Sequence, residues 1–372
     1  MKNYKNIMKK NILFFCPIPP PIGGQALISS IVYNLIKPKF LIDTNVKSKY
    51  FGTLITLFRT FLILIFRKVD LVYFTCTRSK IGAIKDVFLL FLCKLRGIKV
   101  INHLHGNEIM DLFEENDIFS KIITLAYKQI DVTIFVTERQ KELMPLSLSN
   151  MKKIVIPNCY DSILDDVDFN HKNKKDEIQI LYISFLMKSK GVFVALDTFE
   201  KIASEYTNVV FHIAGEPLSD YLMSSAEVKL LFEDKLSKLQ QIYPERFKYH
   251  GVVKGNDKKE LFLNSDILLF PTFFKTESFG LVNVEAMRTG NAVITTDHNF
   301  LSDIVTKDEG ILVKPNDVES TYNAVKYFLE NLETLLKIQQ HNIEHAKLEF
   351  SPEQFNFRIK SLFSQYLERV EN

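Results

Sequence analysis

Short apolar runs alternate with longer amphipathic stretches along this chain of 372 residues. The short runs are rich in β-branched and aromatic residues and predict buried strands, and the stretches between them predict crossover helices. The predicted strands are Asn11–Cys16, Leu71–Phe74, Val100–His103, Thr133–Val136 and Val155–Pro157, followed by Ile178–Ser184, Val209–Ala214, Phe247–His250, Ile267–Phe270, Ala292–Thr295 and Ile311–Val313. This order is typical of an α/β fold with parallel sheets.

The alternation is interrupted between Asp161 and Glu177, where the chain is first acidic, then rich in lysine and poor in aliphatic residues, as linkers are. We therefore predict two Rossmann-like, doubly wound domains that face a cleft, residues 1–165 and residues 166–348. Residues 349–372 are predicted to form a helix that crosses back to the first domain. Its start is marked by Ser351 as N-cap, Pro352 at the first helical position and Gln354 closing a capping box.

The composition is that of a globular protein, with 47% apolar and 24% charged residues. A net charge of +3 is too small to indicate a nucleic-acid partner. The four cysteines lie in apolar surroundings without metal-ligand or CxxC spacing, which predicts buried free thiols in a reducing compartment.

Two stretches of the first half combine apolar and basic residues and bear on membrane association. No secretory signal is visible, and the apolar run from Leu54 to Phe66 is interrupted by Arg59, so we expect no spanning helix and a cytoplasmic protein. The basic and apolar stretches Leu54–Lys68 and Val87–Lys99 fit helices lying at the inner face of a membrane. They fit equally well ordinary packed helices with solvated charged ends.

The segment from Pro271 to Gly290 contains the strongest chemical pattern. A buried strand ends at Pro271, a loop contains Glu277, and a helix is predicted to begin near Gly280. The free amides and dipole of the first helical turn form a site suited to a diphosphate. Glu285 follows on the same helix, so two carboxylates can flank one extended ligand. In the alternative interpretation, Glu277 caps the helix and Glu285 is a solvated surface residue.

This segment resembles the Glu-x7-Glu motif of the retaining glycosyltransferases of family four. Glu277 and Glu285 match its two ends, and Ser278, Phe279, Gly280 and Leu281 match the stretch between them. The resemblance implies a GT-B fold, with Glu277 contacting the donor sugar and Glu285 the ribose. It also implies that the amides of residues 279–281 approach the sugar and the diphosphate.

A second match surrounds Lys190, which with Gly191 follows a predicted strand. A lysine at this point can neutralise phosphate as a mobile cation, although a plain surface lysine near a helix start is the alternative. The family usually has an arginine earlier in the same loop, where this chain has Phe185. Lys188 is the candidate replacement.

Two features of the first half complete the predicted site. Gly23 and Gly24 follow the first strand after three prolines, and glycines there permit unusual backbone conformations and close approach of a ligand, or simply a tight turn. His103 and His105 follow another strand and should lie on one side of it. No third ligand accompanies them, so we predict no metal. The resemblance implies that the glycine loop closes over the donor phosphate and the acceptor, and that His105 faces the donor sugar.

The resemblance to family four implies a retaining glycosyltransferase, and we predict that it needs neither metal nor cofactor. The donor that the resemblance implies is a nucleoside-diphosphate sugar, with uridine diphosphate preferred. The acceptor that it implies is a hydroxyl of a lipid-linked glycan or polysaccharide precursor, such as bacterial O-antigen, other lipopolysaccharide or capsule. Two alternatives are a nucleotide-sugar epimerase of the same fold and a non-catalytic subunit that binds sugar nucleotides.

Overall fold

The computed structural model describes residues 10–20, 23–46, 48, 50–77, 79–106, 108–114, 117–148, 151–166 and 177–368. The chain divides into two compact units, Met1–Asn158 with Glu353–Asn372, and Cys159–Pro352. The domain boundaries expected after residues 165 and 348 remain predictions. Part of the expected linker, residues 167–176, lies outside the described residues, as do residues 21 and 22 of the proline–glycine loop and the last four residues of the chain.

The first unit is built on a six-stranded parallel sheet with the order β2-β1-β3-β4-β5-β6. Its strands are β1 (Ile12–Cys16), β2 (Phe40–Asp43), β3 (Leu71–Thr75), β4 (Lys99–His103), β5 (Val132–Phe135) and β6 (Lys152–Val155). Its helices are α2 (Gly24–Ile36), α3 (Phe51–Phe66), α4 (Lys80–Arg96), α5 (Glu108–Glu114), α6 (Ile118–Tyr127), α7 (Glu138–Glu142) and α14 (Pro352–Glu368), with a 3-10 turn at Leu146–Leu148.

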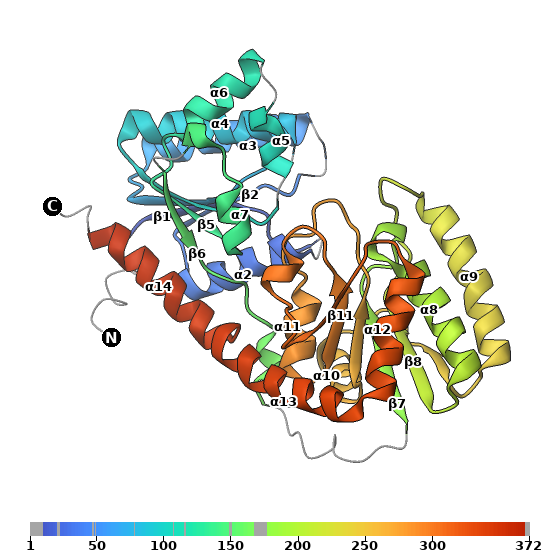
Figure 1. Ribbon diagram of the computed structural model, residues 1–372. Coiled ribbons are helices and arrows are strands. Elements are labelled where there is room, and N and C mark those ends of the chain that lie inside the picture. The colour runs from blue at the N-terminus through green and yellow to red at the C-terminus, as the bar shows by residue number, and fades with distance from the viewer. Residues whose placement is uncertain are drawn as a thin grey trace. The chain divides into compact units, whose positions relative to one another are not determined.

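Alternation along the central strands of this unit serves two helical layers. Leu13 and Phe15 belong to the core under α3, α4, α5 and α6, which lie together on one face of the sheet (Figure 1). Phe14, between them, points to the opposite face, where its ring lies 6.1 Å from Tyr33 of α2 and 6.1 Å from Phe363 of α14. Because successive side chains of a strand point to opposite faces, an apolar strand without polar positions is required between two layers.

The second unit has a parallel sheet with the order β12-β11-β10-β7-β8-β9. Its strands are β7 (Ile178–Ile183), β8 (Val209–Ala214), β9 (Phe247–Tyr249), β10 (Ile267–Phe270), β11 (Ala292–Thr296) and β12 (Gly310–Val313). Its helices are α8 (Val192–Glu205), α9 (Ser225–Ile242), α10 (Gly255–Leu263), α11 (Leu281–Arg288), α12 (Val318–Glu330) and α13 (Leu332–Glu349), with 3-10 turns at Ser162–Leu164, Lys188–Lys190 and Leu301–Asp303.

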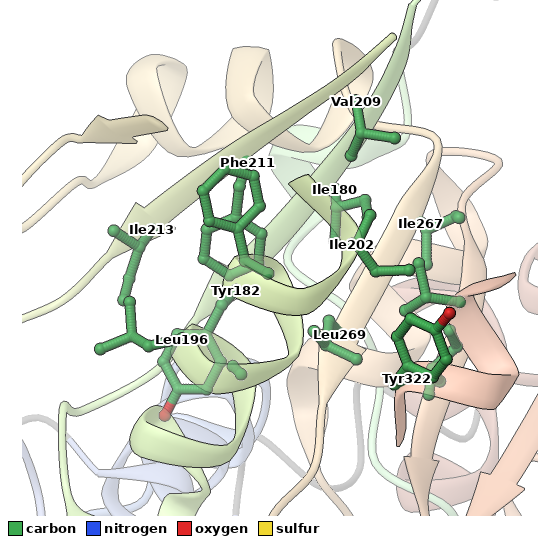
Figure 2. Packing of buried hydrophobic residues seen from close by; sticks show 14 of the residues in the cluster. Ile180, Tyr182, Leu196, Ile202, Val209, Phe211, Ile213, Ile267, Leu269 and Tyr322 are labelled. Carbon is green, nitrogen blue, oxygen red and sulfur yellow. The ribbon is translucent and has the colours of Figure 1, made fainter. Parts of the chain in front are cut away.

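Aromatic stacking organises one face of the second sheet. Phe211 of β8 stacks on Phe199 of α8 and on Phe247 of β9, with ring centroids 5.1 Å and 5.9 Å apart. Figure 2 shows side chains of β7, β8 and β10 packing with Leu196 and Ile202 of α8 in the same cluster. These offset aromatic contacts add to the hydrophobic stabilisation of the layer that α8 forms.

The predicted strands of the second half all form, with ends that shift by at most one residue. In the first half, β2 was not predicted from the sequence, and the last strand was predicted at Val155–Pro157 but forms at Lys152–Val155. Both are edge strands. Edge strands carry charged residues that discourage pairing with other chains, as Lys152 and Lys153 do in β6, and these residues obscure the apolar signal.

We expected no membrane-spanning segment, and α3 is the helix for which this matters most. It has 16 residues and is the most apolar of the described helices of the first unit. Across the described part of the chain, no helix combines the length and the apolar character needed to cross a bilayer.

Truncation of Phe363 tests the packing of α14 on the first sheet. Phe363 is fully buried against Phe14 and Tyr73, so Phe363→Ala should lower the free energy of unfolding by about 3–5 kcal/mol. Urea denaturation followed by circular dichroism measures the change. Phe357→Ala is the matched control, because this phenylalanine of the same helix is 66% exposed and its loss should cost less than about 0.5 kcal/mol. Equal effects of the two substitutions would contradict this packing.

Candidate active site

The strand order of each sheet reverses direction once, and such switch points are where open α/β sheets bind ligands. In the second unit the reversal lies between β7 and β10, whose following loops contain Lys190 and Glu277. In the first unit it lies between β1 and β3. The predicted site residues Gly23 and Gly24 follow β1, so both groups of residues lie at the carboxyl edge of their own sheet.

The two loops of the second unit are held against each other by backbone contacts. The Phe273 amide donates to the Ser189 carbonyl over 2.7 Å. Gly191 has a φ of +78° and lies directly against the Pro271 carbonyl, so any side chain at residue 191 would clash with that carbonyl. The Ser189 amide in turn donates to the Asp220 carboxylate over 2.7 Å. These contacts determine where Lys190 and Glu277 can reach.

Lys190 and Glu277 form an ion pair across the switch point. Their side chains are 15% and 12% exposed, which shelters the pair from solvent without sealing it. The ammonium group of Lys190 also lies 4.7 Å from the centre of the Phe274 ring. Both residues were predicted from the sequence to lie near a phosphate-binding site. In the structure they are in direct contact.

The loop from Thr272 to Phe279 is held from the next strand of the sheet. The Asn299 side chain, after β11, donates to the carbonyl of Glu277 over 3.1 Å and to that of Lys275 over 2.9 Å. The His298 ring contacts the Phe274 carbonyl over 3.0 Å. Glu277 therefore projects from a loop fixed at several backbone positions, which limits its range of orientations.

Helix α11 begins directly after this loop. Its N-cap is Gly280, which adopts the left-handed conformation at a φ of +64°. A Cβ atom at this position would lie 2.7 Å from the side-chain nitrogen of Asn283. Phe279 is buried, and Ser278 and Leu281 are half-buried on either side of this start. Asn283, in the first turn, is fully buried, and neither polar atom of its side-chain amide has a hydrogen-bond partner within the described chain. Asn283 is a candidate ligand contact that the sequence reading missed.

Glu285 does not lie on a solvated face, so that alternative is wrong: its side chain is 3% exposed. Its Oε1 accepts from Lys258 of α10 over 2.6 Å, while its Oε2 has no partner among the described residues. Burial raises the pKa of Glu285, and the Lys258 cation opposes that rise. Lys258 was also missed, because 27 residues and a strand separate it from Glu285.

Phe185 and Lys188 occupy the loop between β7 and Lys190. Phe185 is 37% exposed, and Lys188 is half-buried at the start of the 3-10 turn that contains Lys190. That Lys188 replaces the arginine of the family remains a prediction.

A pocket of about 330 Å³ lies at the switch point of the first unit. It is lined by the ends of β1, β2 and β3 and by the starts of α2 and α4, through Phe15, Pro17, Gly23, Gly24, Gln25, Ala26, Thr44, Asn45, Thr75, Cys76, Thr77, Lys85 and Asp86. Gly23 has an ordinary extended φ of −149°, and Gly24 is helical. These glycines therefore do not adopt the unusual backbone conformation that they permit. Among the described residues beyond its chain neighbours, no atom lies within 4 Å of the position that a Cβ atom would take at Gly23, so a ligand can approach this side of its backbone.

Asp86 is the buried charge of this pocket. Its carboxylate accepts from the Thr77 amide over 2.9 Å and from the Tyr127 hydroxyl over 2.7 Å. Burial raises the pKa of Asp86 to about 6. Burial also lowers the pKa of the neighbouring Lys85. A single acidic residue inside an amphipathic helix gives no signal in the sequence, which is why the pair was missed.

The rings of His103 and His105 lie side by side, tilted by 37° with centroids 4.0 Å apart, as expected for side chains on one side of an extended segment. Both are buried, and Nδ1 of His103 lies 2.8 Å from the Tyr73 hydroxyl. Burial lowers the pKa of His103 to about 3, so its imidazole is neutral at physiological pH. Both histidines belong to the first unit, whereas Lys190, Glu277 and Glu285 belong to the second.

Two parallel sheets, each with polar groups gathered at its switch point, define a two-unit α/β protein of the doubly wound class. Comparison with known proteins specifies the class further. Residues 165–345 match the family described as Glycosyl transferases group 1. The match covers just under half of the chain and includes Lys190, Glu277 and Glu285.

Two curated relatives carry the same kind of name. The chain is 24% identical over 210 residues to the phosphatidylinositol N-acetylglucosaminyltransferase gpi3 subunit of Schizosaccharomyces pombe, covering 55% of this chain and 43% of the relative. It is 23% identical over 203 residues to the capsular polysaccharide biosynthesis glycosyltransferase CapM of Staphylococcus aureus, covering 54% and 50%. The matches thus span half the length of these relatives or less.

The fold is shared over nearly the whole chain. The structure of HepE from Anabaena in complex with UDP superimposes with a TM-score of 0.73 at 16% identity, covering 95% of this chain and 100% of HepE. The predicted GT-B fold, with its two parallel sheets and terminal helix, is confirmed. The matches agree with the predicted enzyme class, a glycosyltransferase.

The Lys258–Glu285 pair gives a pH-dependent prediction. Lys258→Met should lower the free energy of unfolding at pH 8 by about 3–5 kcal/mol, because an uncompensated carboxylate is left buried. The folded-state pKa of Glu285 is raised, so the penalty should shrink as the pH falls and the carboxyl group takes up a proton. Chemical denaturation at pH 5 and pH 8 measures both values.

The control is Lys238→Met, which removes a partner of Glu200 in a pair whose side chains are 56% and 36% exposed. It should change stability little at either pH. A Lys258→Met variant that loses the same stability at pH 5 and at pH 8 would contradict the assigned role of Glu285.

Proposed function

We propose that this protein transfers a sugar from a nucleoside-diphosphate sugar to a hydroxyl group of an acceptor, with retention of the anomeric configuration. The observation that carries the proposal is the Lys190–Glu277 pair at the switch point of the second sheet. A sheltered cation and a sheltered carboxylate, beside the free amides of a helix start, match a ligand that has both phosphates and hydroxyl groups.

In the proposed complex, Lys190 and the first amides of α11 neutralise the charge that develops on the departing diphosphate. Glu277 accepts hydrogen bonds from hydroxyls of the donor sugar and keeps Lys190 in place. Glu285 Oε2 and the Asn283 amide are buried polar groups without partners in the described chain, which suits the nucleoside end of the same ligand. Uridine is the preferred base, and the UDP complex of HepE supports this choice.

Retention is proposed from the resemblance to family four and from the position of Glu277. An inverting enzyme needs a base on the face opposite the leaving diphosphate. Glu277 is instead paired with the lysine proposed to bind that diphosphate. The route assigned to the family, in which the leaving phosphate helps to deprotonate the acceptor, requires no further carboxylate. His105 is proposed to face the donor sugar.

The acceptor is proposed to enter the pocket at the switch point of the first unit. Lys85 and Asp86 line it together with the Gly23–Gly24 loop, so both hydroxyl and phosphate groups find partners there. A lipid-linked glycan of the capsule or O-antigen type fits the resemblance, and the name of CapM supports a polysaccharide product.

An exposed apolar surface on the first unit supports a membrane-bound acceptor. Helix α3 buries only Thr56, Thr60 and Leu64, whereas Phe51, Leu54 and Phe58 are more than 60% exposed. Helices α4 and α6, on the same layer, add exposed Phe91, Leu95, Ile118 and Leu125 (Figure 1). An ordinary packed helix buries its apolar stripe, so we favour the alternative in which α3 lies on the inner face of a membrane.

Transfer is tested by incubating the protein with radiolabelled UDP-sugars and lipid-linked acceptors in the presence of EDTA. We expect a labelled lipid product whose proton NMR spectrum shows the anomeric configuration of the donor. Glu277→Gln should lower turnover by at least ~100-fold, the scale of a lost transition-state contact. Glu233→Gln, at a 57% exposed position of α9, is the control and should leave turnover unchanged.

Other outcomes separate the alternatives. Conversion of the donor to its epimer without acceptor would identify an epimerase, and donor binding without any product would identify a non-catalytic subunit. Activity that is lost in EDTA and restored by manganese or magnesium would overturn the proposed role of Lys190, and an inverted product would overturn retention.

Membrane association is tested by sedimentation with vesicles containing anionic lipid. The protein should pellet at low salt and less at high salt, because Arg59, Arg67 and Lys68 each add about 1 kcal/mol of attraction. Leu54→Ser/Phe58→Ser should abolish pelleting, whereas Leu230→Ser, at a 70% exposed leucine of the second unit, should not. A wild-type protein that stays in the supernatant at low salt would exclude this surface as a membrane contact.

A further inference from the structure

A second cluster of chemically active side chains lies away from the proposed donor site. Glu309 directly precedes β12, at the amino edge of the second sheet, whereas Lys190 and Glu277 follow β7 and β10 at the carboxyl edge. His341 and His345 lie one turn apart on α13 and converge on Glu309. The Oε1 atom of Glu309 lies 2.9 Å from Nε2 of His341 and 3.1 Å from Nδ1 of His345.

We propose that Glu309, His341 and His345 bind a divalent transition metal of the zinc class. Two imidazole nitrogens and one carboxylate oxygen are a ligand set that zinc prefers over calcium or magnesium. The three ligand atoms lie within 4.8 Å of one another. Ligands placed about 2.0–2.2 Å from a tetrahedral ion are roughly 3.3–3.5 Å apart, so only small side-chain movements are needed.

The carboxylate is oriented by an outer shell, as metal ligands usually are. Its second oxygen, Oε2, accepts from the Thr306 amide over 2.8 Å and from the Thr306 hydroxyl over 2.6 Å. Oε1 is therefore directed at the two histidines. The His345 ring also stacks on Phe350, with centroids 5.7 Å apart, which restricts its rotation.

The backbone around the cluster is fixed independently of the histidines. The side-chain Nδ2 of Asn342, which lies between them on α13, donates to the backbone carbonyls of Asn291 and Glu309 over 2.7 and 2.9 Å. One turn earlier, Gln339 donates to the Asp266 carbonyl over 3.0 Å. These bonds attach α13 to the amino ends of β10, β11 and β12, so the ligands are preorganised and an ion would strengthen an existing junction.

Access and burial also suit an exchangeable ion. Glu309 is 3% exposed, while the side chains of His341 and His345 are 43% and 31% exposed. The carboxylate is thus sheltered and the imidazoles border solvent, which leaves an entry path and room for a water molecule as fourth ligand. This proposal does not depend on the transfer activity, because the cluster lies at the opposite edge of the sheet from Glu277.

The test uses the full chain after removal of metal with EDTA and exchange into chelator-free buffer. Titration with Co²⁺ should produce the intense visible absorption bands of tetrahedral cobalt, with one equivalent bound per chain. Zn²⁺ should displace the cobalt and raise Tm by about 5 °C at a hundred-fold excess of free ion over its Kd, whereas Mg²⁺ should do neither.

His341→Gln/His345→Gln should abolish the cobalt bands and weaken zinc binding by more than the roughly 10–100-fold that loss of an outer-shell partner costs. His212→Gln/His250→Gln removes another close histidine pair, whose ring nitrogens are 2.9 Å apart, and should bind metal like the wild type. If the first variant fails to fold, the wild-type titration still decides. Absence of tetrahedral bands in the wild type, or their persistence in a folded His341→Gln/His345→Gln variant, would overturn the proposal.

Discussion

The close approach of two backbone segments, at Gly191 and Pro271, is the constraint on which the proposed donor site depends. The two loops leave adjacent strands, β7 and β10, and remain in contact because residue 191 has no side chain to separate them. Lys190 lies directly next to this junction, and Glu277 lies a few residues beyond it. Their ion pair is therefore a consequence of backbone packing, and a larger residue at position 191 would displace both partners together.

Glu277, Glu285 and Glu309 are sheltered carboxylates of the second unit, and each is compensated differently. Glu277 is paired with Lys190 in a partly exposed ion pair, Glu285 is buried and paired with the partly exposed Lys258, and Glu309 faces two histidines. The cost of burying a charge explains why each has a partner within contact distance. The differences between partners match the different tasks proposed for the three: contact with the donor sugar, contact with the nucleoside end of the donor, and binding of a metal ion.

The first unit departs from the usual rule of helix amphipathicity in α3. The stripe that this helix turns toward its own unit contains two threonines, whose hydroxyls donate to backbone carbonyls of the same helix. Its larger apolar side chains are exposed. A helix of this kind gains little hydrophobic stabilisation from packing on its own sheet. Its exposed apolar side chains can still be buried against a partner, which in our proposal is the lipid surface that holds the acceptor.

The sequence by itself determined the class of fold, because buried parallel strands leave continuous apolar runs and crossover helices separate them by regular intervals. It also predicted Lys190 and Glu277 as candidate site residues, since each belongs to a local motif directly after a strand. It did not reveal Lys258, Asn283, Asp86 or the Glu309 cluster. Lys258 reaches Glu285 across 27 residues and His341 reaches Glu309 across 32, and no local pattern records such pairings. Tertiary structure decided them, because only the packing of α4 in the first unit and of α10, α11 and α13 in the second shows which polar groups are buried and which side chains lie near enough to compensate them.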